Sequence, residues 1–344
     1  MKREWKMMIH EAMLWTPAEG GRVDCGLCAH RCAIAAGKWG VCGVRENRAG
    51  RLVTHAYGEV VAVHADPIEK KPLYHFLPGT TSLSIATAGC NFRCGFCQNW
   101  QISQSKAKDG RGGGQTFPPE RIVEAALAGD CRSVSYTYTE PTVFFEYAFD
   151  TARLAKARGL ANVFVTNGYM TAEAIEAIRP FLDAANVDLK AFRDETYKSV
   201  CGARLQPVLD SIRRLRGHGI WVEVTTLVVP GMNDGEDELA DLARFLAEVD
   251  AGIPWHLSRF HPDYEFTEHQ PTPTDILRRA AEIGRAAGLK HVYIGNVPGA
   301  GDLTLCPQCG AMLIRRRGFR VDENHLDTAG CCPDCGVLVP GVWK

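Results

Sequence analysis

The sequence has almost no net charge, because 39 lysines and arginines stand against 40 aspartates and glutamates, a formal −1 at pH 7. A protein that binds a generic polyanion or a charged membrane surface through its overall field needs an excess of one sign. The balance therefore argues against both classes of binder. Any basic surface on this protein has to be local.

Long apolar runs are also missing. The sequence nowhere approaches the roughly 18 uninterrupted apolar residues of a transmembrane helix. The opening MKREWKMMIH carries charge but has no continuous apolar stretch behind it, unlike a secretory signal. We therefore expect no membrane association and a cytoplasmic location. The 344 residues are ample for a full apolar core without covalent staples.

Cysteine, in contrast, is abundant: the chain has 14. In a small secreted protein this count would indicate disulfides, but this chain is long and shows no signal pattern. Thiolates closely spaced on one loop can bind a single ion or cluster, and they suit zinc and iron. Metal binding is therefore the first hypothesis. All cysteines except Cys131 and Cys201 fall into three groups: Cys25, Cys28, Cys32, Cys42; Cys90, Cys94, Cys97; and Cys306, Cys309, Cys331, Cys332, Cys335.

Between about residues 80 and 297, β-branched or apolar runs alternate with helical patterns. The runs that predict strands are 83–88, 133–138, 162–166, 186–190, 221–229, 255–260 and 291–295. Helical patterns lie between them, with Thr171 and Thr274 as expected N-caps. Repeated strand–helix units predict an α/β fold with a parallel sheet, either doubly wound or a full or partial barrel. In all of these folds the chemistry lies at the carboxyl ends of the strands.

Both flanks fall outside this pattern. The first cysteine group lies in residues 1–79, which show no clear helical period beyond their start, and the last lies in residues 301–344, in short, turn-rich pieces. We therefore expect three parts: an N-terminal Cys-rich module (1–79), the α/β core (80–300) and a C-terminal zinc-ribbon-like module (301–344).

The central group follows the strand run 83–88 directly, as Cys90-x3-Cys94-x2-Cys97 in GCNFRCGFCQNW. Three cysteines are an incomplete ligand set for a four-iron cluster, so one iron would keep an open position for a substrate or cofactor. The alternative is a zinc knuckle that borrows a distant histidine. The position after a strand, and Phe96 before the last cysteine, argue against that alternative.

This motif in a strand–helix setting resembles the signature of the radical S-adenosylmethionine (SAM) superfamily. Within it the chain resembles the pyruvate formate-lyase activating enzyme-like branch, and most closely the radical SAM enzyme of the AmmeMemoRadiSam system. The segments that carry this closer resemblance lie at 25–45, 90–103, 136–144, 165–169, 187–192, 225–234 and 255–264, with CPQCG and CPDCG near the C-terminus.

The resemblance implies a partial (β/α)6 TIM-like barrel as the radical SAM core, with a [4Fe-4S] cluster on Cys90, Cys94 and Cys97. SAM would bind the open iron through its amino and carboxylate groups. One electron would cleave it to methionine and a 5′-deoxyadenosyl radical, which abstracts hydrogen from an unidentified substrate. Reduced ferredoxin or flavodoxin would supply the electron, and Memo-like and AMMECR-type proteins are the implied partners.

The resemblance also implies contacts to SAM. Glu140, in YTEP where relatives carry a Gly-Gly-Glu type motif, would bind the methionyl ammonium. Lys190 would pair with the methionyl carboxylate and Asp188 with nearby polar groups, although such a pair is also an ordinary strand-end salt bridge. Asn167 would contact a ribose hydroxyl, yet Asn-Gly is also simple turn chemistry. His261 would lie near the adenosine.

Two further positions bear on this resemblance. His256 lies on a predicted strand, where a lone histidine is more often a hydrogen-bonded core residue than a ligand. Thr225 lies where activating enzymes of glycyl radical enzymes tend to have arginine. That departure weakens the transfer of their substrate to this chain but not of their SAM chemistry.

Near the C-terminus two Cys-Pro-x-Cys-Gly knuckles, Cys306 with Cys309 and Cys332 with Cys335, form a four-thiolate set. The glycine after each second cysteine permits the tight turn of a knuckle, and four thiolates fit a closed tetrahedral zinc site. Cys331 is the alternative to Cys332. The basic run between the knuckles is interpreted as a solvated hairpin face rather than a nucleic-acid contact; it consists of Arg315, Arg316, Arg317 and Arg320.

The N-terminal group, Cys25, Cys28, Cys32 and Cys42, is also a four-thiol set, with His30 as a further candidate ligand. It would hold zinc or an auxiliary iron–sulfur cluster, and the sequence does not choose, because the spacing lacks the fourth cysteine and proline of the ferredoxin run. Four free thiols would be an oxidation liability, so a metal-free role is the least favoured.

Three function classes compete. The leading one is a radical SAM oxidoreductase, acting on a protein glycine as a glycyl-radical-enzyme activase proper or on another substrate. The second is a zinc-ribbon protein that binds nucleic acid or an acidic partner, which the net charge and the α/β core oppose. The third is electron transfer alone, in which Glu140, Asp188 and Lys190 would have no role at strand ends.

Overall fold

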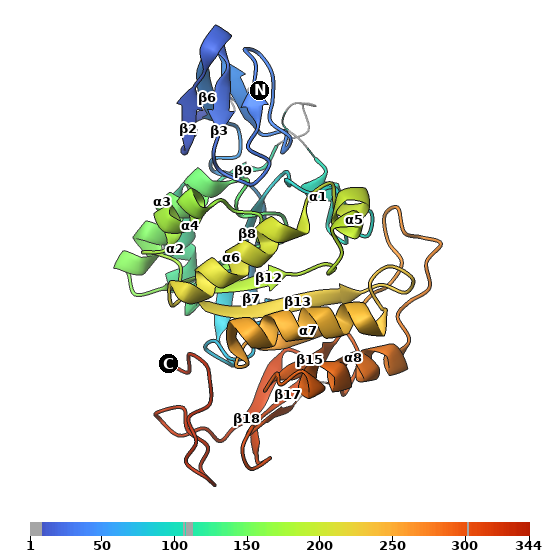
Figure 1. Ribbon diagram of the computed structural model, residues 1–344. Coiled ribbons are helices and arrows are strands. Elements are labelled where there is room, and N and C mark those ends of the chain that lie inside the picture. Colours follow the sequence, from blue (N-terminus) through green and yellow to red (C-terminus); the bar gives the residue numbers. More distant parts are fainter. Residues whose placement is uncertain (1–8, 106, 108–112, 301–302) are drawn as a thin grey trace. The chain divides into compact units, whose positions relative to one another are not determined.

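The computed structural model describes residues 9–105, 107, 113–300 and 303–344 (Figure 1). The chain divides into two compact units. The first comprises the described parts of Met1–Ala65 and Ser82–Asp183, and the second those of Asp66–Thr81 and Ala184–Lys344.

The first unit has an α/β part built on three parallel strands. β10 (Ser133–Tyr136) pairs in parallel with both β8 (Thr81–Thr87) and β11 (Ala161–Thr166). Every residue of β10 is buried, as in a parallel sheet whose two faces are covered. The helices of this part are α1 (Trp100–Ser103), α2 (Pro119–Ala128), α3 (Phe145–Ala157) and α4 (Ala172–Ile178).

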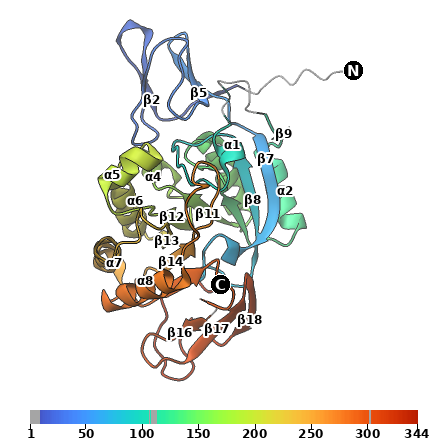
Figure 2. The ribbon, with the colours of Figure 1, turned by 90° about the vertical axis from the view of Figure 1, so that its right-hand side faces the viewer.

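Small antiparallel sheets form the N-terminal region of the same unit. One has the order β1-β6-β5 and another the order β2-β3-β4. A longer strand, β7 (Glu59–Pro67), lies beside β8 and pairs antiparallel with β9 (Gln115–Thr116) (Figure 2). The short elements described in this region are β1 (His10–Glu11), β2 (Trp15–Pro17), the 3-10 turn η1 (Glu19–Gly21), β3 (Val23–Cys25), β4 (Ala33–Ile34), β5 (Arg45–Arg48) and β6 (Arg51–Thr54).

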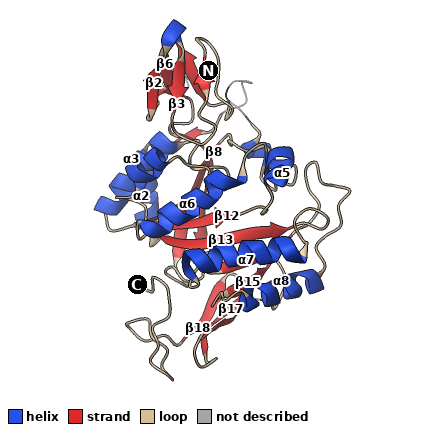
Figure 3. Ribbon diagram, viewed as in Figure 1, coloured by secondary structure: helices blue, strands red, loops and turns tan. Residues whose placement is uncertain are grey.

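The second unit contains four parallel strands in chain order, β12 (Ala184–Asp188), β13 (Trp221–Val228), β14 (Trp255–Arg259) and β15 (Val292–Gly295). Helix α6 packs on β13, and α8 packs on β14 and β15 (Figure 3). A Cβ at Gly284 of α8 would lie 2.9 Å from the Trp255 ring, so glycine permits this close approach. Helices of this unit are η2 (Ile68–Lys70), α5 (Asp194–Thr196), the π-turn η4 (Tyr197–Cys201), α6 (Leu205–Gly217), α7 (Glu236–Asp250) and α8 (Thr274–Ala286).

A separate antiparallel sheet ends the second unit. Its order is β16 (Leu303–Leu305), β17 (Met312–Arg317) and β18 (Arg320–Asn324). The sheet and the turns beside it have a small core of their own, formed by Cys306, Leu313, Ile314, Cys332 and Val339.

The predicted α/β pattern with parallel strands is confirmed, and each predicted strand run contains a strand of nearly the same bounds. Thr171 caps α4 as expected, since its side chain accepts a hydrogen bond from Ala174 N. The cap predicted at Thr274 is wrong. Pro273 occupies the cap position, Thr274 is already the first helical residue, and no side chain caps the helix. None of the described helices combines the length and apolar character needed to cross a membrane.

Candidate functional site

The central cysteines lie on the loop between β8 and α1. Cys90 and Cys94 are buried, and Cys97 is partly exposed with its Sγ 3.2 Å from Ser103 Oγ. Gly89 starts the loop with a φ of +103°, where a Cβ would come within 2.9 Å of Val44. Only glycine tolerates this turn without strain. All three thiols therefore lie on one loop that follows the carboxyl end of β8.

The surroundings of Cys90 favour a bound cation. Burial first, and then the neighbouring Glu140 carboxylate, raise the pKa of the Cys90 thiol above its usual range. A coordinating metal reverses this, because its positive charge stabilises the thiolate. The side-chain atoms Asn91 Nδ2 and Thr87 Oγ1 are buried with no hydrogen-bond partner among the described residues. A three-thiolate cluster and a polar ligand beside it fit these residues.

Glu140 is fully buried and follows β10 in the chain. Its Oε1 accepts hydrogen bonds from Thr142 N (3.0 Å) and Thr166 Oγ1 (2.7 Å), while its Oε2 accepts one from Asn167 N (2.7 Å). Burial raises the pKa of this carboxyl, and the hydrogen bonds oppose the rise. The residue predicted to bind an ammonium group is thus held firmly beside the cysteine loop.

Asn167 follows β11, and the turn brings its side chain back to the first cysteine. Its Nδ2 lies 3.4 Å from Cys90 Sγ and 3.3 Å from Asn91 Oδ1, and it donates to both. Asn167 therefore contacts the cysteine loop in addition to forming the Asn-Gly turn. Hydrogen bonds to metal-ligating sulfur are among the contacts that set the properties of iron–sulfur clusters.

The other predicted SAM contacts belong to the second unit. Asp188 ends β12, and its Oδ2 lies 2.9 Å from Lys190 Nζ. His261 is exposed in the segment after β14. Asp188 and Lys190 therefore form the strand-end salt bridge that was the alternative interpretation. Their contacts to SAM stay a prediction.

His256 is a core histidine, as its position on a strand indicated. Its Nε2 lies 2.7 Å from Glu223 Oε2, and both residues are buried. Thr225, on the preceding strand, donates a hydrogen bond to Asn186 Oδ1 at 2.9 Å.

The C-terminal thiols converge. The sulfur atoms of Cys306, Cys309, Cys332 and Cys335 all lie within 4.8 Å of one another. The Cys306–Cys335 and Cys309–Cys332 pairs are 3.6 and 3.7 Å apart, and zinc at about 2.3 Å from each sulfur would separate the sulfurs by about 3.8 Å. Burial opposes ionisation of Cys306, but the neighbouring backbone amides lower its pKa to about 7. The set fits a tetrahedral metal ion.

Cys331 lies outside this set. Its N–H donates to Asp327 Oδ1 at 2.8 Å, and its backbone bridges to Leu338. The sulfur of Cys332, and not that of Cys331, therefore belongs to the converging set.

The basic run is a solvated face only in part. Arg315 pairs with Glu323, and both Arg317 and Arg320 pair with Asp322. Arg316 is instead buried, because it points to the opposite face of β17. The prediction that all four arginines are solvated is wrong for that residue, and the acidic partners of the others weaken the case for nucleic-acid binding.

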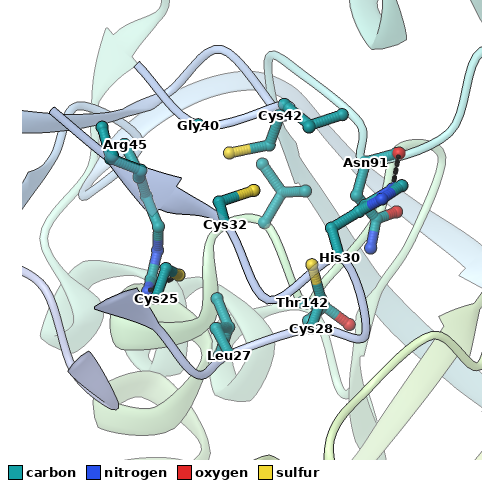
Figure 4. Close-up of a pocket in the computed structure, with 13 residues that line it drawn as sticks. Cys25, Leu27, Cys28, His30, Cys32, Gly40, Cys42, Arg45, Asn91 and Thr142 are labelled. Carbon is teal, nitrogen blue, oxygen red and sulfur yellow. Dashed lines mark hydrogen bonds between the residues drawn. The ribbon is translucent and has the colours of Figure 1, made fainter. Parts of the chain in front are cut away.

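The N-terminal cysteines line one cavity of the first unit, together with His30, Arg45 and Asn91 (Figure 4). Its four thiols are Cys25, Cys28, Cys32 and Cys42. Burial raises the pKa of the Cys28 thiol, and the other three cysteines add to the rise.

Three residues of these sites were not predicted from the sequence: Thr87, Asn91 and Arg45. The first two flank the start of the cysteine motif, so their position in the chain was a usable signal. Arg45 donates from its Nη1 to Cys25 Sγ at 3.2 Å. It follows Cys42 closely in the chain, but nothing in the sequence indicated its burial.

Comparisons with known proteins agree with this arrangement. A family model described as the Radical SAM superfamily matches residues 84–245. The uncharacterized protein MJ0808 of Methanocaldococcus jannaschii is 45% identical over 331 residues, which is 95% of this chain and 98% of that protein. The isethionate sulfite-lyase activating enzyme of Nitratidesulfovibrio vulgaris is 33% identical over 150 residues, 41% of this chain and about half (48%) of that enzyme.

Among solved structures, the chain is similar to Streptococcus suis SuiB bound to S-adenosylmethionine, with a TM-score of 0.50 and 15% sequence identity. The match covers 67% of this chain and 53% of that chain. At this identity the similarity concerns the fold alone.

Proposed function

Because this chain belongs to the radical SAM superfamily, we propose that it cleaves SAM reductively at a [4Fe-4S] cluster held by Cys90, Cys94 and Cys97. The membership implies both the cluster and SAM. When bound, the cluster supplies one electron to SAM, whose cleavage provides the radical that takes hydrogen from the substrate. The core of the enzyme is then a partial (β/α)6 barrel in residues 80–300, flanked by the modules 1–79 and 301–344.

One observation carries this proposal: three thiols share a loop at the end of β8, beside two buried polar atoms that have no partner in the described part of the chain. Those atoms are Thr87 Oγ1 and Asn91 Nδ2. A ligand with its own polar groups, as SAM has, would satisfy both.

The residues predicted to act at the site then have separate roles. Asn167 donates to Cys90 Sγ and holds the first cysteine in place. Within the described residues Glu140 Oε2 accepts one hydrogen bond, from Asn167 N, so a lone pair remains for the methionyl ammonium. Lys190 would take the methionyl carboxylate, with Asp188 beside it. His261 would contact the adenosine.

Partners follow from the same proposal. Radical SAM activating enzymes generally take their electron from reduced flavodoxin or ferredoxin, and this chain has activating enzymes among its relatives. Memo-like and AMMECR-type proteins are the further partners. We favour a substrate other than the glycine of a glycyl radical enzyme. Thr225 stands where the activating enzymes of glycyl radical enzymes tend to have arginine, and it is hydrogen-bonded to Asn186.

The C-terminal set serves the fold. We assign zinc to Cys306, Cys309, Cys332 and Cys335, because their spacing matches a tetrahedral thiolate site. Two of these residues, Cys306 and Cys332, lie in the small core of the terminal sheet. Zinc there stabilises the sheet and takes no part in the reaction.

The test compares the wild-type protein with Cys94→Ala after anaerobic reconstitution with ferrous iron and sulfide. We expect the variant to lose 5′-deoxyadenosine formation from SAM with dithionite and to keep the ribbon zinc. Cys131→Ala is the matched control, since Cys131 is also buried but lies outside the three groups. SAM cleavage that survives in Cys94→Ala would overturn the cluster assignment.

A further inference from the structure

The N-terminal cavity is built from distant parts of the first unit. Its cysteines come from β3 and from the segments on either side of β4. Figure 4 shows the sulfurs of Cys28, Cys32 and Cys42 around one space, with Cys25 at its edge beside Arg45. The space between them is narrow, with a cavity volume of about 20 Å³. The other polar side chains that line it are those of His30, Asn91 and Thr142.

Backbone contacts hold these thiols in position. Cys25 N donates to Cys32 O at 2.9 Å, and Cys28 forms a β-bridge with Met170. Ala29 N donates to Tyr169 O at 3.0 Å. The cysteines are therefore fixed by the fold before any metal binds, as a preorganised ligand set requires.

The charges at the cavity point to a metal centre. Arg45 is the one arginine or lysine among the described walls, and Glu146 already pairs with it. Both side chains of that pair are buried, at 2% and 1% exposure. A metal centre bound by the four sulfurs would supply the positive charge that holds them as thiolates.

The spacing of the sulfur atoms distinguishes a site for one zinc ion from a site for an iron–sulfur cluster. The ribbon cysteines bring four sulfurs within 4.8 Å of one another, and no other set of three or more cysteine, histidine or carboxylate ligand atoms among the described residues does so. A zinc ion needs its sulfurs about 3.8 Å apart. A four-iron cluster binds each cysteine through a different iron and so spreads the sulfurs more widely. The N-terminal sulfurs do not form such a set, which favours a cluster over a single zinc ion.

The cavity also borders the central cysteine loop. His30 Nε2 lies 2.8 Å from Asn91 O, and Asn91 directly follows Cys90 in the chain. The Tyr169 ring packs against both His30 and Phe92, with centroid distances of 4.9 and 5.1 Å. A single residue, Asn91, therefore lines the N-terminal cavity and adjoins the first central ligand.

The opposite side of the cavity leads outward. Cys25 also lines an open hollow of about 1020 Å³, shared with Trp15, Arg31 and Glu173. Arg31 and Glu173 form an ion pair at 2.8 Å with both side chains about half exposed. The N-terminal thiols thus lie between a surface hollow and the central loop, which is the position of a relay.

We propose that Cys25, Cys28, Cys32 and Cys42 hold a second iron–sulfur cluster that exchanges one electron with the cluster on the central loop. In the forward direction the second cluster is oxidised by one electron and the central cluster is reduced by one. Reduced ferredoxin or flavodoxin then restores the second cluster, and no bond or proton changes place. The exchange rests on the proposed function, whereas the second metal site does not.

The metal site is tested by iron and sulfide analysis of the full chain after anaerobic reconstitution with ferrous iron and sulfide. The triple variant C90A/C94A/C97A should keep about four irons per chain with a visible iron–sulfur absorption band. The quadruple variant C25A/C28A/C32A/C42A should also keep about four, and the wild type about eight. The matched control C131A/C201A, which changes two buried cysteines outside all groups, should match the wild type.

The triple variant decides the result even where the quadruple variant does not fold, because it leaves the N-terminal site intact. Absence of iron from the triple variant, or zinc in place of iron beyond the ribbon's single ion, would overturn the proposal. Failure of SAM cleavage in the wild type would instead contradict the proposed function, and the iron counts of the variants would be unaffected.

The exchange is tested by electron paramagnetic resonance of the fully reduced wild-type protein. Two adjacent reduced clusters interact magnetically, so we expect a broadened or split spectrum that neither the triple nor the quadruple variant shows. A wild-type spectrum equal to the sum of the two variant spectra would place the clusters too far apart and overturn the exchange.

Discussion

Asn167 donates a hydrogen bond from its side-chain Nδ2 to Cys90 Sγ across 3.4 Å, although the two residues belong to different strand–helix units. The same side chain reaches Asn91 Oδ1, and its backbone N–H binds Glu140. The turn after β11 is thereby tied to the cysteine loop after β8 and to the acidic residue after β10. Three strand ends contribute to one site, as expected of a parallel sheet.

Replacing Asn167 by alanine should weaken the central site without unfolding the protein. Loss of a hydrogen bond from an outer residue to a metal ligand typically costs about 10- to 100-fold in metal affinity or activity. We expect a drop of this order in SAM cleavage and a shift of the cluster potential, since the sulfur loses a donor. Redox titration followed by paramagnetic resonance measures the shift. Asn324→Ala, at the exposed end of β18, should leave the potential unchanged.

Glu140→Gln should weaken SAM binding while iron is retained. The amide replaces one carboxylate oxygen by a donor and removes the charge that would face the ammonium, and a hydrogen bond to a charged group is worth about 1.5–3 kcal/mol. A Kd increase of about 10- to 100-fold is expected in equilibrium binding of SAM. Loss of iron in this variant would instead indicate a fold defect.

SAM binding should also depend on pH through the same residue. Burial raises the pKa of Glu140 above 4.5 despite its hydrogen bonds, so the carboxylate is protonated at a higher pH than an ordinary glutamate. A group whose pKa is higher in the folded than in the unfolded protein stabilises the fold at a pH below its unfolded-state pKa. That stabilisation is lost as the pH rises through the folded-state pKa. For SAM the sign is opposite, because the ammonium requires the carboxylate. Affinity should fall on mild acidification in the wild type and vary less in Glu140→Gln.

The terminal zinc site offers a paired test on adjacent residues. Cys332→Ser should lose about one zinc per chain and lower the melting temperature, because Cys332 belongs to both the thiol set and the small core. Cys331→Ser should keep its zinc, since that residue serves through its backbone. Metal analysis of the two variants is sufficient. Equal loss from both would show that the ligand assignment is wrong.

Arg316 and its neighbour Arg317 form a second matched pair, for stability. Arg316 is fully buried, donates to Tyr74 O at 2.7 Å and lies 3.8 Å from the buried Glu69. Arg316→Ala would leave that carboxylate without its charge partner, at a cost of about 3–5 kcal/mol in the free energy of unfolding. Arg317 is 79% exposed, so Arg317→Ala should change stability by about 0.5 kcal/mol or less. Urea denaturation compares them, and similar values would contradict the burial argument.

The strand runs and the cysteine groups could be predicted because both are local. A run such as 162–166 carries its β-branched pattern within a few residues, and the helix after it begins at Thr171 through a side-chain bond three residues along. The knuckle at Cys306 and Cys309 is likewise a short turn. Local patterns of this kind predict structure without any knowledge of the tertiary packing.

Thr274 shows the limit of such local rules. The sequence offered a capping threonine, but Pro273 takes the cap position and Thr274 enters the helix. Which of two neighbouring residues starts a helix depends on the path of the incoming chain, and that path is a tertiary property.

By itself, the sequence determined the order of strands and helices, the three sets of thiols and the three-cysteine motif after β8, because spacing along the chain sets which residues share a loop. Only the tertiary structure decided that Asn167 meets Cys90, that Glu146 pairs with Arg45 and that Arg316 is buried whereas Arg317 is not. These relationships join residues far apart in the chain or opposite faces of one strand. They arise when the strands pair and the apolar faces close, which buries some charges and selects their partners.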